Sequence, residues 1–325
     1  YLPGGETLPL VIKPNVDDLD PIDWVKNNRE FLETQLLERG AILFRGFNLD
    51  SVSGFENFAG TICPQLFGEY GDLPREGIGG KVYGSTPYPS DKAILFHNES
   101  SHLHCWPLKI WFFCVQPAQE GGETPIVNCR KIYQMLDKKL RSHFEEKQLM
   151  YVRNYTEGLD VSWQEFFHTN DRKVVEESCL KSKTELEWKN GNGLRTRRIA
   201  QAITKHPKTE DVVFFNQILL HHISCLDPAV RESLLSLFGE ENLPRNVYYG
   251  DGSPIEDSVM AEIQAIYREA SISFPWQQGD VLMLDNMLVA HSRNPYIGAR
   301  KIVVAMGEMF QKEIVTQDME GAYAN

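Results

Sequence analysis

Short β-rich segments occur in two separate blocks of this chain, one in its middle and one near its C-terminal end. They cover residues 81–84, 92–96 and 109–115 in the middle block, and 280–284, 287–292 and 300–309 in the last block. Short strands at this spacing, separated by turn-forming residues, are typical of a sandwich or barrel. We therefore expect an irregular antiparallel β core that is assembled from both blocks.

Helical patterns precede this core. Asp20 before Pro21 is typical of a capped helix start, and the apolar stripe that follows continues until Gly40. Residues 41–47 are short, apolar and bounded by glycine, which indicates a buried strand, while residues 51–59 indicate a second helix.

Between the two β blocks the patterns predict helices and one hairpin. These elements lie at residues 129–147 and 161–183, at 185–200 around Asn190-Gly191, from Asp227-Pro228 onward, and along the stripe 259, 263, 266 and 267. No linker, repeat or low-complexity segment is visible. We therefore expect a single domain over residues 1–325, with an N-terminal helical part at about 1–60 and a helical insert at about 129–183.

Composition excludes several classes of protein. No stretch approaches the ~20 apolar residues that a membrane-spanning helix needs, and a net charge of −12 opposes general binding to nucleic acid. The six cysteines are widely spaced without a C-x-x-C pair, so we expect free thiols in a reducing compartment. We therefore expect a cytoplasmic location. An organelle is the alternative, because a start at Tyr1 is compatible with a removed targeting peptide. The oligomeric state stays open.

The segment His97-Asn98-Glu99 carries the first chemical signal. On a helix, His97 and Glu99 would point about 200° apart and could not share a metal ion. On a strand, residues i and i+2 lie on one face roughly 6.5–7 Å apart at Cα, so both side chains can converge on one ion. Because residues 92–96 are predicted as a strand, this tripeptide supplies two ligands of a candidate metal site. A solvated pair is the alternative.

His291 is the third candidate ligand. It lies on a predicted strand among apolar neighbours, after the polar pair Asp285-Asn286. Two histidines and one carboxylate leave three open positions on an octahedral ion, which is the facial arrangement of non-haem Fe(II) oxygenases. A core histidine satisfied by hydrogen bonds is the alternative.

Two further residues fit a carboxylate ligand beside such an ion. Arg300 opens the last apolar strand and shares a face with Ile302 and Val304, and burial of an arginine is costly without an anionic partner. A carboxylate held bidentately by the guanidinium, with the hydroxyl of Thr124 beside it, would satisfy this need. A structural pair with an aspartate or glutamate is the alternative for Arg300.

Four motifs occur in the order and approximate spacing of one known family. They are His97-x-Glu99, the Gly-Gly-Glu-Thr element ending at Thr124, Asp285-Asn286 before His291, and Arg300. From about residue 41 to 309 the chain resembles the taurine dioxygenase and clavaminate synthase family of Fe(II)- and 2-oxoglutarate-dependent oxygenases. The resemblance implies a mainly β fold with flanking helices, in which a double-stranded β-helix (jelly roll, cupin-like) core carries helical inserts.

The resemblance also implies roles for five residues. His97, Glu99 and His291 would be the catalytic ligands of Fe(II), while Arg300 and Thr124 would bind the distal carboxylate of 2-oxoglutarate. O₂ and 2-oxoglutarate would be the cosubstrates, and the oxidation of a small organic substrate would release succinate and CO₂. A glutamate ligand looks more like clavaminate synthase, since many relatives use aspartate.

One position departs from taurine dioxygenase. That enzyme carries a second arginine four residues after the first, which binds the sulfonate of its substrate, whereas this chain has Val304 there. We therefore expect neither a sulfonate nor another anion at that point.

Further polar residues lie beside these motifs. Asn98, Ser100 and His102 are candidate substrate contacts, with loop hydrogen bonding as the alternative for His102 and for His104. The basic run 195–198 could attract an anionic substrate, and a solvated hairpin strand is the alternative.

Two other functions stay open from the residues alone. A zinc-dependent hydrolase could use the same His/Glu/His ligands with a bound water, although it has no use for Arg300 and Thr124. A catalytically silent β-helix protein could bind a metabolite or a partner, although such a relative commonly loses at least one of the five residues.

Overall fold

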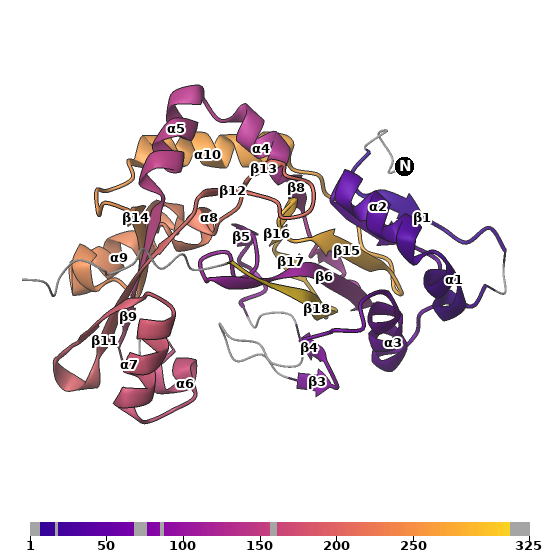
Figure 1. The fold of residues 1–325 in the computed structure, drawn as a ribbon, viewed down its shortest axis with the longest axis horizontal. Coiled ribbons are helices and arrows are strands. Elements are labelled where there is room, and N and C mark those ends of the chain that lie inside the picture. Colours follow the sequence, from indigo (N-terminus) through magenta and orange to yellow (C-terminus); the bar gives the residue numbers. More distant parts are fainter. Residues whose placement is uncertain (1–6, 17–18, 68–76, 85–87, 157–160, 313–325) are drawn as a thin grey trace, which may run out of the picture.

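The computed structural model describes residues 7–16, 19–67, 77–84, 88–156 and 161–312, and its main element is a seven-stranded sheet (Figure 1). In sheet order the strands are β1 (Leu10–Ile12), β2 (Ala41–Phe44), β15 (Val281–Asp285), β6 (Cys105–Gln116), β18 (Lys301–Gln311), β4 (Val82–Gly84) and β3 (Gly77–Gly79). All pairs are antiparallel except β1 with β2.

A three-stranded antiparallel sheet lies beside the large one. It consists of β5 (Ile94–His97), β16 (Val289–Arg293) and β8 (Ile126–Asn128), with β16 in the centre. Strands from the middle and from the end of the chain alternate in both sheets, because β6 lies between β15 and β18, and β16 lies between β5 and β8. The expected antiparallel core assembled from two blocks is confirmed.

Side chains of the large sheet alternate between two apolar cores, as the two-residue period of a strand requires. Trp111 and Met283 face the helices α1 (Pro21–Asn27), α2 (Arg29–Arg39) and α3 (Val52–Ile62). Phe112 and Leu282 face the other way, into the core that also contains residues of the small sheet. The large sheet is therefore buried on both faces. The face that carries Phe112 and Leu282 packs in the same core as residues of β16.

The remaining helices and strands surround this pair of sheets. The helices are α4 (Cys129–Met135), α5 (Lys138–Lys147), α6 (Trp163–Phe167), α7 (Arg172–Lys181), α8 (Ile218–His221), α9 (Pro228–Phe238) and α10 (Asp257–Ala270). A four-stranded sheet has the order β10 (Glu185–Trp188), β11 (Leu194–Ala200), β9 (Leu149–Tyr155) and β14 (Arg245–Tyr249). Two small pairs complete the fold: β12 (Ile203–Lys205) with β13 (Val212–Phe214), and β17 (Tyr296–Ile297) with β7 (Glu120–Gly121).

Two expectations about helices need correction. The expected helical insert at residues 129–183 contains the strand β9, because its partners β11 and β14 come later in the chain and the local pattern does not reveal them. The first expected helix is broken at Asn28, whose side chain donates a hydrogen bond to the Trp24 carbonyl at 2.8 Å and so competes with the helical ladder.

The predicted hairpin and the predicted free thiols are both found. Strand β10 pairs antiparallel with β11, and Gly191 has a φ of 67° in the turn. The cysteines are free: Cys63, Cys105, Cys114, Cys129, Cys179 and Cys225. Within the described ranges, no helix has the length and apolar character that crossing a membrane requires.

Gly40 ends α2 and lies against the start of β16, so we expect its replacement to be costly. Its φ is 87°, and a Cβ at this position would lie 2.6 Å from Cγ2 of Val289. Gly40→Ala should lower the free energy of unfolding by about 3 kcal/mol, since left-handed strain adds to overpacking. Gly191→Ala, at a φ of 67° with nothing within 4 Å, should cost only about 1 kcal/mol. Urea unfolding curves measure both changes, and equal losses would contradict this role of Gly40.

Candidate metal centre

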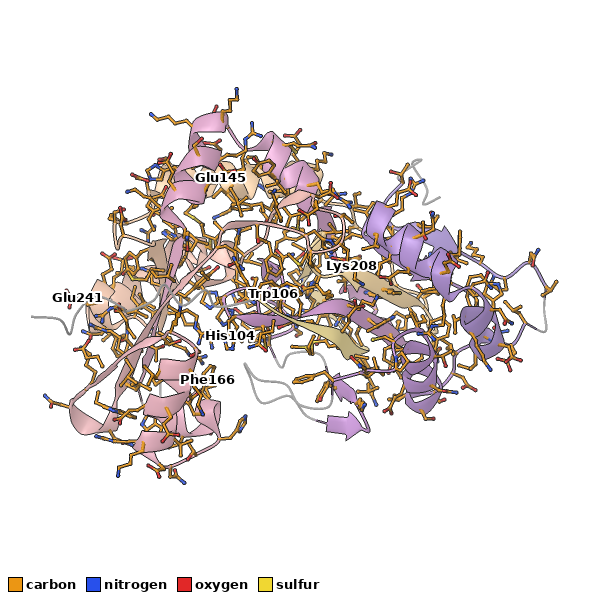
Figure 2. The ribbon with its side chains drawn as sticks, in the orientation of Figure 1. His104, Trp106, Glu145, Phe166, Lys208 and Glu241 are labelled. Carbon is orange, nitrogen blue, oxygen red and sulfur yellow. The ribbon has the colours of Figure 1, made fainter. Side chains whose placement is uncertain are left out.

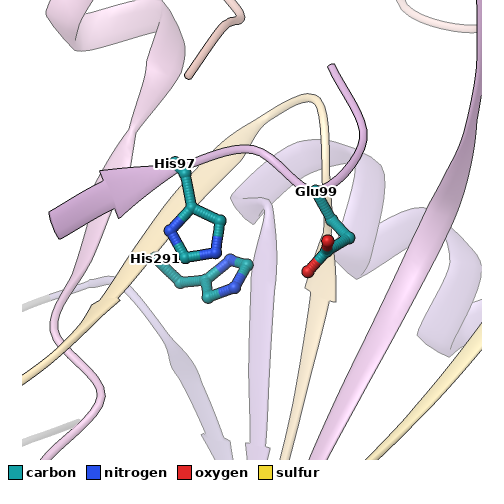
Figure 3. A group of neighbouring side chains, drawn as sticks. All are labelled: His97, Glu99 and His291. Atoms are coloured by element: carbon teal, nitrogen blue, oxygen red, sulfur yellow. The ribbon is translucent and has the colours of Figure 1, made fainter. Parts of the chain in front are cut away.

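His97 and His291 lie directly opposite each other on neighbouring antiparallel strands, β5 and β16. Their ring centroids are 4.4 Å apart. Glu99 follows two residues after His97, just beyond the end of β5, and its carboxylate turns toward both rings (Figure 3). One ligand atom from each of the three side chains lies within 4.8 Å of the others, so the three residues can hold one metal ion.

The surroundings of these side chains fit a divalent cation. Glu99 is 5% exposed, and burial raises the pKa of its carboxyl to about 8. A bound cation would offset the cost of keeping this carboxylate charged. Nδ1 of His97 lies 2.8 Å from the Leu95 carbonyl oxygen, so it carries the proton and leaves Nε2 as a ligand atom. Two imidazoles with one carboxylate are a donor set suited to iron.

Asn286 holds the backbone of Glu99 from the next turn. Its Oδ1 accepts a hydrogen bond from the Glu99 amide at 2.7 Å, and its Nδ2 donates to the carbonyls of Glu99 and Pro107, both at 2.9 Å. Asn286 is fully buried, so these bonds are not exchanged with water. The side chain therefore fixes the position of a candidate ligand.

The preceding residue, Asp285, is held by a buried histidine. Its Oδ1 accepts from the amides of Met287 and Leu288, and its Oδ2 lies 3.0 Å from Nε2 of His206. Because Nδ1 of His206 accepts from the amide of Thr209, the ring proton is on Nε2 and is donated to Asp285. This contact ties the loop after β12 to the turn that leads into the strand of His291.

Arg300 and Thr124 come together as the sequence predicted. Nη2 of Arg300 lies 3.5 Å from Oγ1 of Thr124, and its Nε donates to the Gly122 carbonyl at 2.8 Å. A Cβ on Gly122 would lie 2.9 Å from Cδ of Arg300, which explains the glycine in this element. Burial is the main cause that lowers the pKa of Arg300, to about 10, and Arg293 adds to it.

One cavity contains all five residues that the resemblance singled out. Its lining is Ile94, His97, Glu99, Phe112, Thr124, His291, Ser292, Arg293, Arg300, Ile302 and Val304. Arg300, Ile302 and Val304 share this side, as predicted, while Lys301 is exposed. The cavity thus joins the candidate metal ligands to a cationic end, with apolar side chains between them.

The three candidate substrate contacts lie elsewhere. Asn98 is fully buried, donates to the Asn286 carbonyl at 2.6 Å and accepts from the Asn216 amide at 3.3 Å, so we interpret it as a positioning residue. Ser100 is buried, with a φ of 55°. The ring of His102 packs on those of Tyr151 and His221. None of the three is part of the cavity lining around the metal centre.

Sequence reasoning missed two residues of this site. Trp276 is buried in the core and also donates from Nε1 to Oγ1 of Thr124 at 3.2 Å. His206 gave no signal at all, because its partner Asp285 lies 79 residues away in the sequence. The polar pair Asp285-Asn286 in an apolar region was the available clue to a supporting network.

Comparison with protein families identifies the chain. Residues 6–306 match the model of the family described as "Taurine catabolism dioxygenase TauD, TfdA family". The chain belongs to this family. The predicted family and enzyme class are therefore confirmed: it is an Fe(II)- and 2-oxoglutarate-dependent dioxygenase, with O₂ as the further cosubstrate. Membership of this family argues against the two alternative functions, a zinc-dependent hydrolase and a catalytically silent binding protein.

Two curated proteins resemble this family member over most of its length. It is 38% identical to the dapdiamide synthesis protein DdaC of Enterobacter agglomerans over 272 residues, 83% of each chain. It is 30% identical to a clavaminate synthase-like protein of Arabidopsis thaliana over 297 residues, which cover 87% of this chain and 86% of that one.

Solved structures share the fold at low sequence identity. PvcB of Pseudomonas aeruginosa has a TM-score of 0.54 and 13% identity, covering 91% of this chain and 84% of its own. AAD-2, in complex with Mn(II) and N-oxalylglycine, has a TM-score of 0.53 and 13% identity, covering 94% and 96%. The chain is therefore a strand-rich mixed α/β protein of the jelly-roll type found in this family.

The contacts of Asn286 predict that it supports metal binding. Asn286→Asp would turn a carboxylate oxygen toward the carbonyls of Glu99 and Pro107, and we expect the affinity for Fe(II) to fall about 10–100-fold. Asn28→Ala is the control, because this side chain donates to the Trp24 carbonyl within the first helical segment, and its loss should leave the affinity unchanged. Competition with a chelator measures both. A loss of stability without a loss of metal affinity would contradict this role.

Proposed function

We propose that this dioxygenase oxidises a small organic molecule with O₂ and 2-oxoglutarate, and releases succinate and CO₂. The observation that carries the proposal is the single cavity that contains His97, Glu99, His291, Thr124 and Arg300. We further propose that the seven- and three-stranded sheets form a double-stranded β-helix in one domain.

In this proposal His97, Glu99 and His291 would hold Fe(II). Bound Fe(II) supplies the activation of O₂ that is coupled to oxidative decarboxylation of 2-oxoglutarate. With only three protein ligands, the ion would remain accessible to 2-oxoglutarate and O₂. The protein itself contributes positioning of these groups and exclusion of competing reactions.

Arg300 and Thr124 bind the far carboxylate of 2-oxoglutarate. A partly buried guanidinium favours a carboxylate partner, since the pair recovers part of the desolvation cost that lowers the pKa of Arg300. Oγ1 of Thr124 accepts from Trp276 at 3.2 Å, so the hydroxyl proton stays available for donation to the carboxylate. Trp276 thereby orients this hydroxyl.

The rest of the cavity favours a small substrate. Ile94, Phe112, Ile302 and Val304 contribute apolar side chains to its lining, which reduces the access of water to the reacting groups. The likeness to DdaC, whose name assigns it to dapdiamide synthesis, also supports a small organic molecule as substrate.

We expect succinate formation to depend on both Fe(II) and 2-oxoglutarate. A screen of small metabolites with iron and ascorbate should yield compounds that stimulate succinate release, and Zn(II) in place of Fe(II) should abolish it. His291→Ala should abolish it as well, because one ligand is lost. Succinate release that persists in metal-free protein would contradict the proposal.

Replacement of Arg300 should weaken 2-oxoglutarate binding selectively. Because a hydrogen bond to a charged group contributes about 1.5–3 kcal/mol, Arg300→Gln should raise the KM for 2-oxoglutarate at least about tenfold. Lys301→Gln is the matched control, since the neighbouring side chain is exposed and should leave this KM unchanged. An unchanged KM in Arg300→Gln would remove this residue from the cosubstrate site.

A further inference from the structure

Arg293 in β16 holds a segment of the chain that precedes β5. Its Nη1 donates a hydrogen bond to the carbonyl of Tyr88 at 3.1 Å, and its Nη2 donates to the carbonyls of Pro89 and Lys92, both at 2.6 Å. Residues 88–93, called the outer segment below, are exposed, whereas Arg293 is 7% exposed. Side chains fill the space between the strands of the core (Figure 2), and a guanidinium buried among them needs acceptors. The outer segment supplies three.

The backbone of Arg293 also fixes the place where β5 begins. It pairs with Ile94, the first residue after the outer segment. Two residues earlier on β16, His291 pairs with His97, so two steps along β16 correspond to three steps along β5, which is a bulge. On a regular strand residues three apart point to opposite faces, yet Ile94 and His97 both line the cavity. Arg293 therefore holds the start of β5 by its backbone and by its side chain.

Tyr296 connects the outer segment to Arg300. The amide of Tyr296 donates to the carbonyl of Ser90 at 2.8 Å. Its ring contacts two guanidiniums, because Cζ of Arg293 lies 5.2 Å from the ring centroid and Cζ of Arg300 lies 5.6 Å from it. Contacts of this length between a guanidinium and an aromatic ring are attractive. One ring therefore links the arginine that we propose for the cosubstrate to Arg293 and to the outer segment.

The other contacts of Arg300 come from the element that ends at Thr124. Its Nε donates to the carbonyl of Gly122 at 2.8 Å, and the amide of Gly122 donates to the carbonyl of Pro295, the neighbour of Tyr296, at 3.0 Å. A long arginine side chain loses conformational entropy when its position is fixed. A guanidinium that a carbonyl and a ring already hold loses less of this entropy when it binds a carboxylate, so the carboxylate is bound more tightly.

We propose that Arg293 and Tyr296 are positioning residues for the cosubstrate. Arg293 holds the outer segment beside β17, and Tyr296 keeps the guanidinium of Arg300 directed at the far carboxylate of 2-oxoglutarate. This inference rests on the proposed function, because it takes Arg300 as the residue that binds the cosubstrate. Arg293 acts through its neighbours and not on 2-oxoglutarate itself, since its Nη1 and Nη2 are bound to carbonyls.

Trypsin digestion measures how firmly Arg293 holds the outer segment. The peptide bond after Lys92 contains a carbonyl that accepts from Nη2 of Arg293, so cleavage there requires this hydrogen bond to open. Arg293→Gln and Arg293→Lys should both speed this cleavage at least about tenfold, because an ammonium group does not reproduce the planar fork that reaches three carbonyls. Cleavage after Lys181, at the exposed end of α7, should keep its rate. Mass spectrometry of the fragments measures both rates.

The cosubstrate should stabilise the same contact in the native protein. If the held segment favours binding of 2-oxoglutarate, linkage requires 2-oxoglutarate to favour the held segment by the same factor. Saturating 2-oxoglutarate with Fe(II) under anaerobic conditions should therefore slow cleavage after Lys92 about tenfold, and leave cleavage after Lys181 unchanged. Lack of protection at Lys92 would overturn the coupling.

Binding of 2-oxoglutarate to the Fe(II)-loaded protein tests Tyr296. Tyr296→Leu removes the face of the ring and should raise the Kd for 2-oxoglutarate about tenfold, whereas Tyr296→Phe keeps the ring and should retain the native Kd. Arg293→Lys should also raise the Kd, although it keeps the charge. Lys92→Gln is the matched control with an unchanged Kd, since it removes a charge from the outer segment but none of its carbonyls.

Three results would overturn the inference and leave the proposed function intact. They are a native Kd in Tyr296→Leu while Arg300→Gln raises it, a native Kd in Arg293→Lys, which would reduce this residue to its charge, and equal acceleration of cleavage after Lys92 and Lys181, which would indicate a general loss of stability. An unchanged Kd in Arg300→Gln would instead contradict the proposed cosubstrate site, together with the inference that depends on it. Circular dichroism checks that each variant is folded.

Discussion

The pairing of β16 with β5 is the constraint on which the rest of the structure depends. It places His291 directly opposite His97, although the two residues are 194 positions apart in the sequence. Two contacts keep β16 in this position. Strand β8 pairs with its other edge, and β15, which precedes β16 in the chain, is part of the large sheet. The long ladder between β6 and β18 carries the opposite wall, including Phe112, whose ring centroid lies 5.0 Å from that of His291.

Buried polar groups around the centre are used for positioning. Asn286 makes three hydrogen bonds to the backbone near Glu99, Asp285 is held by His206, and Thr124 is held by Trp276. Such groups are costly to bury unless each is satisfied, so a network of this kind admits few alternative arrangements. The protein itself therefore holds the backbone of Glu99 and the turn that leads to His291.

Local patterns, together with the resemblance to a known family, were sufficient to single out five residues that the structure brings to one cavity. His97 and Glu99 are two apart on a strand, and the face shared by Arg300, Ile302 and Val304 follows from the strand period. Patterns that span only a few neighbouring residues could not predict strand β9, whose partner strands come later in the chain. They also could not predict the contact between His206 and Asp285. Nor could they show that Asn98 turns into the protein, since this depends on Asn216 and Asn286, which are far away in the sequence.

Anaerobic titration of the Fe(II)-loaded protein with 2-oxoglutarate tests the central claim most directly. Chelation of the ion by the cosubstrate should produce a new visible absorption band in the native protein. His97→Ala and His291→Ala should give no such band, because each removes one of the paired ligands. A band of native intensity in either variant, or no band in native protein that holds one equivalent of iron, would contradict the account.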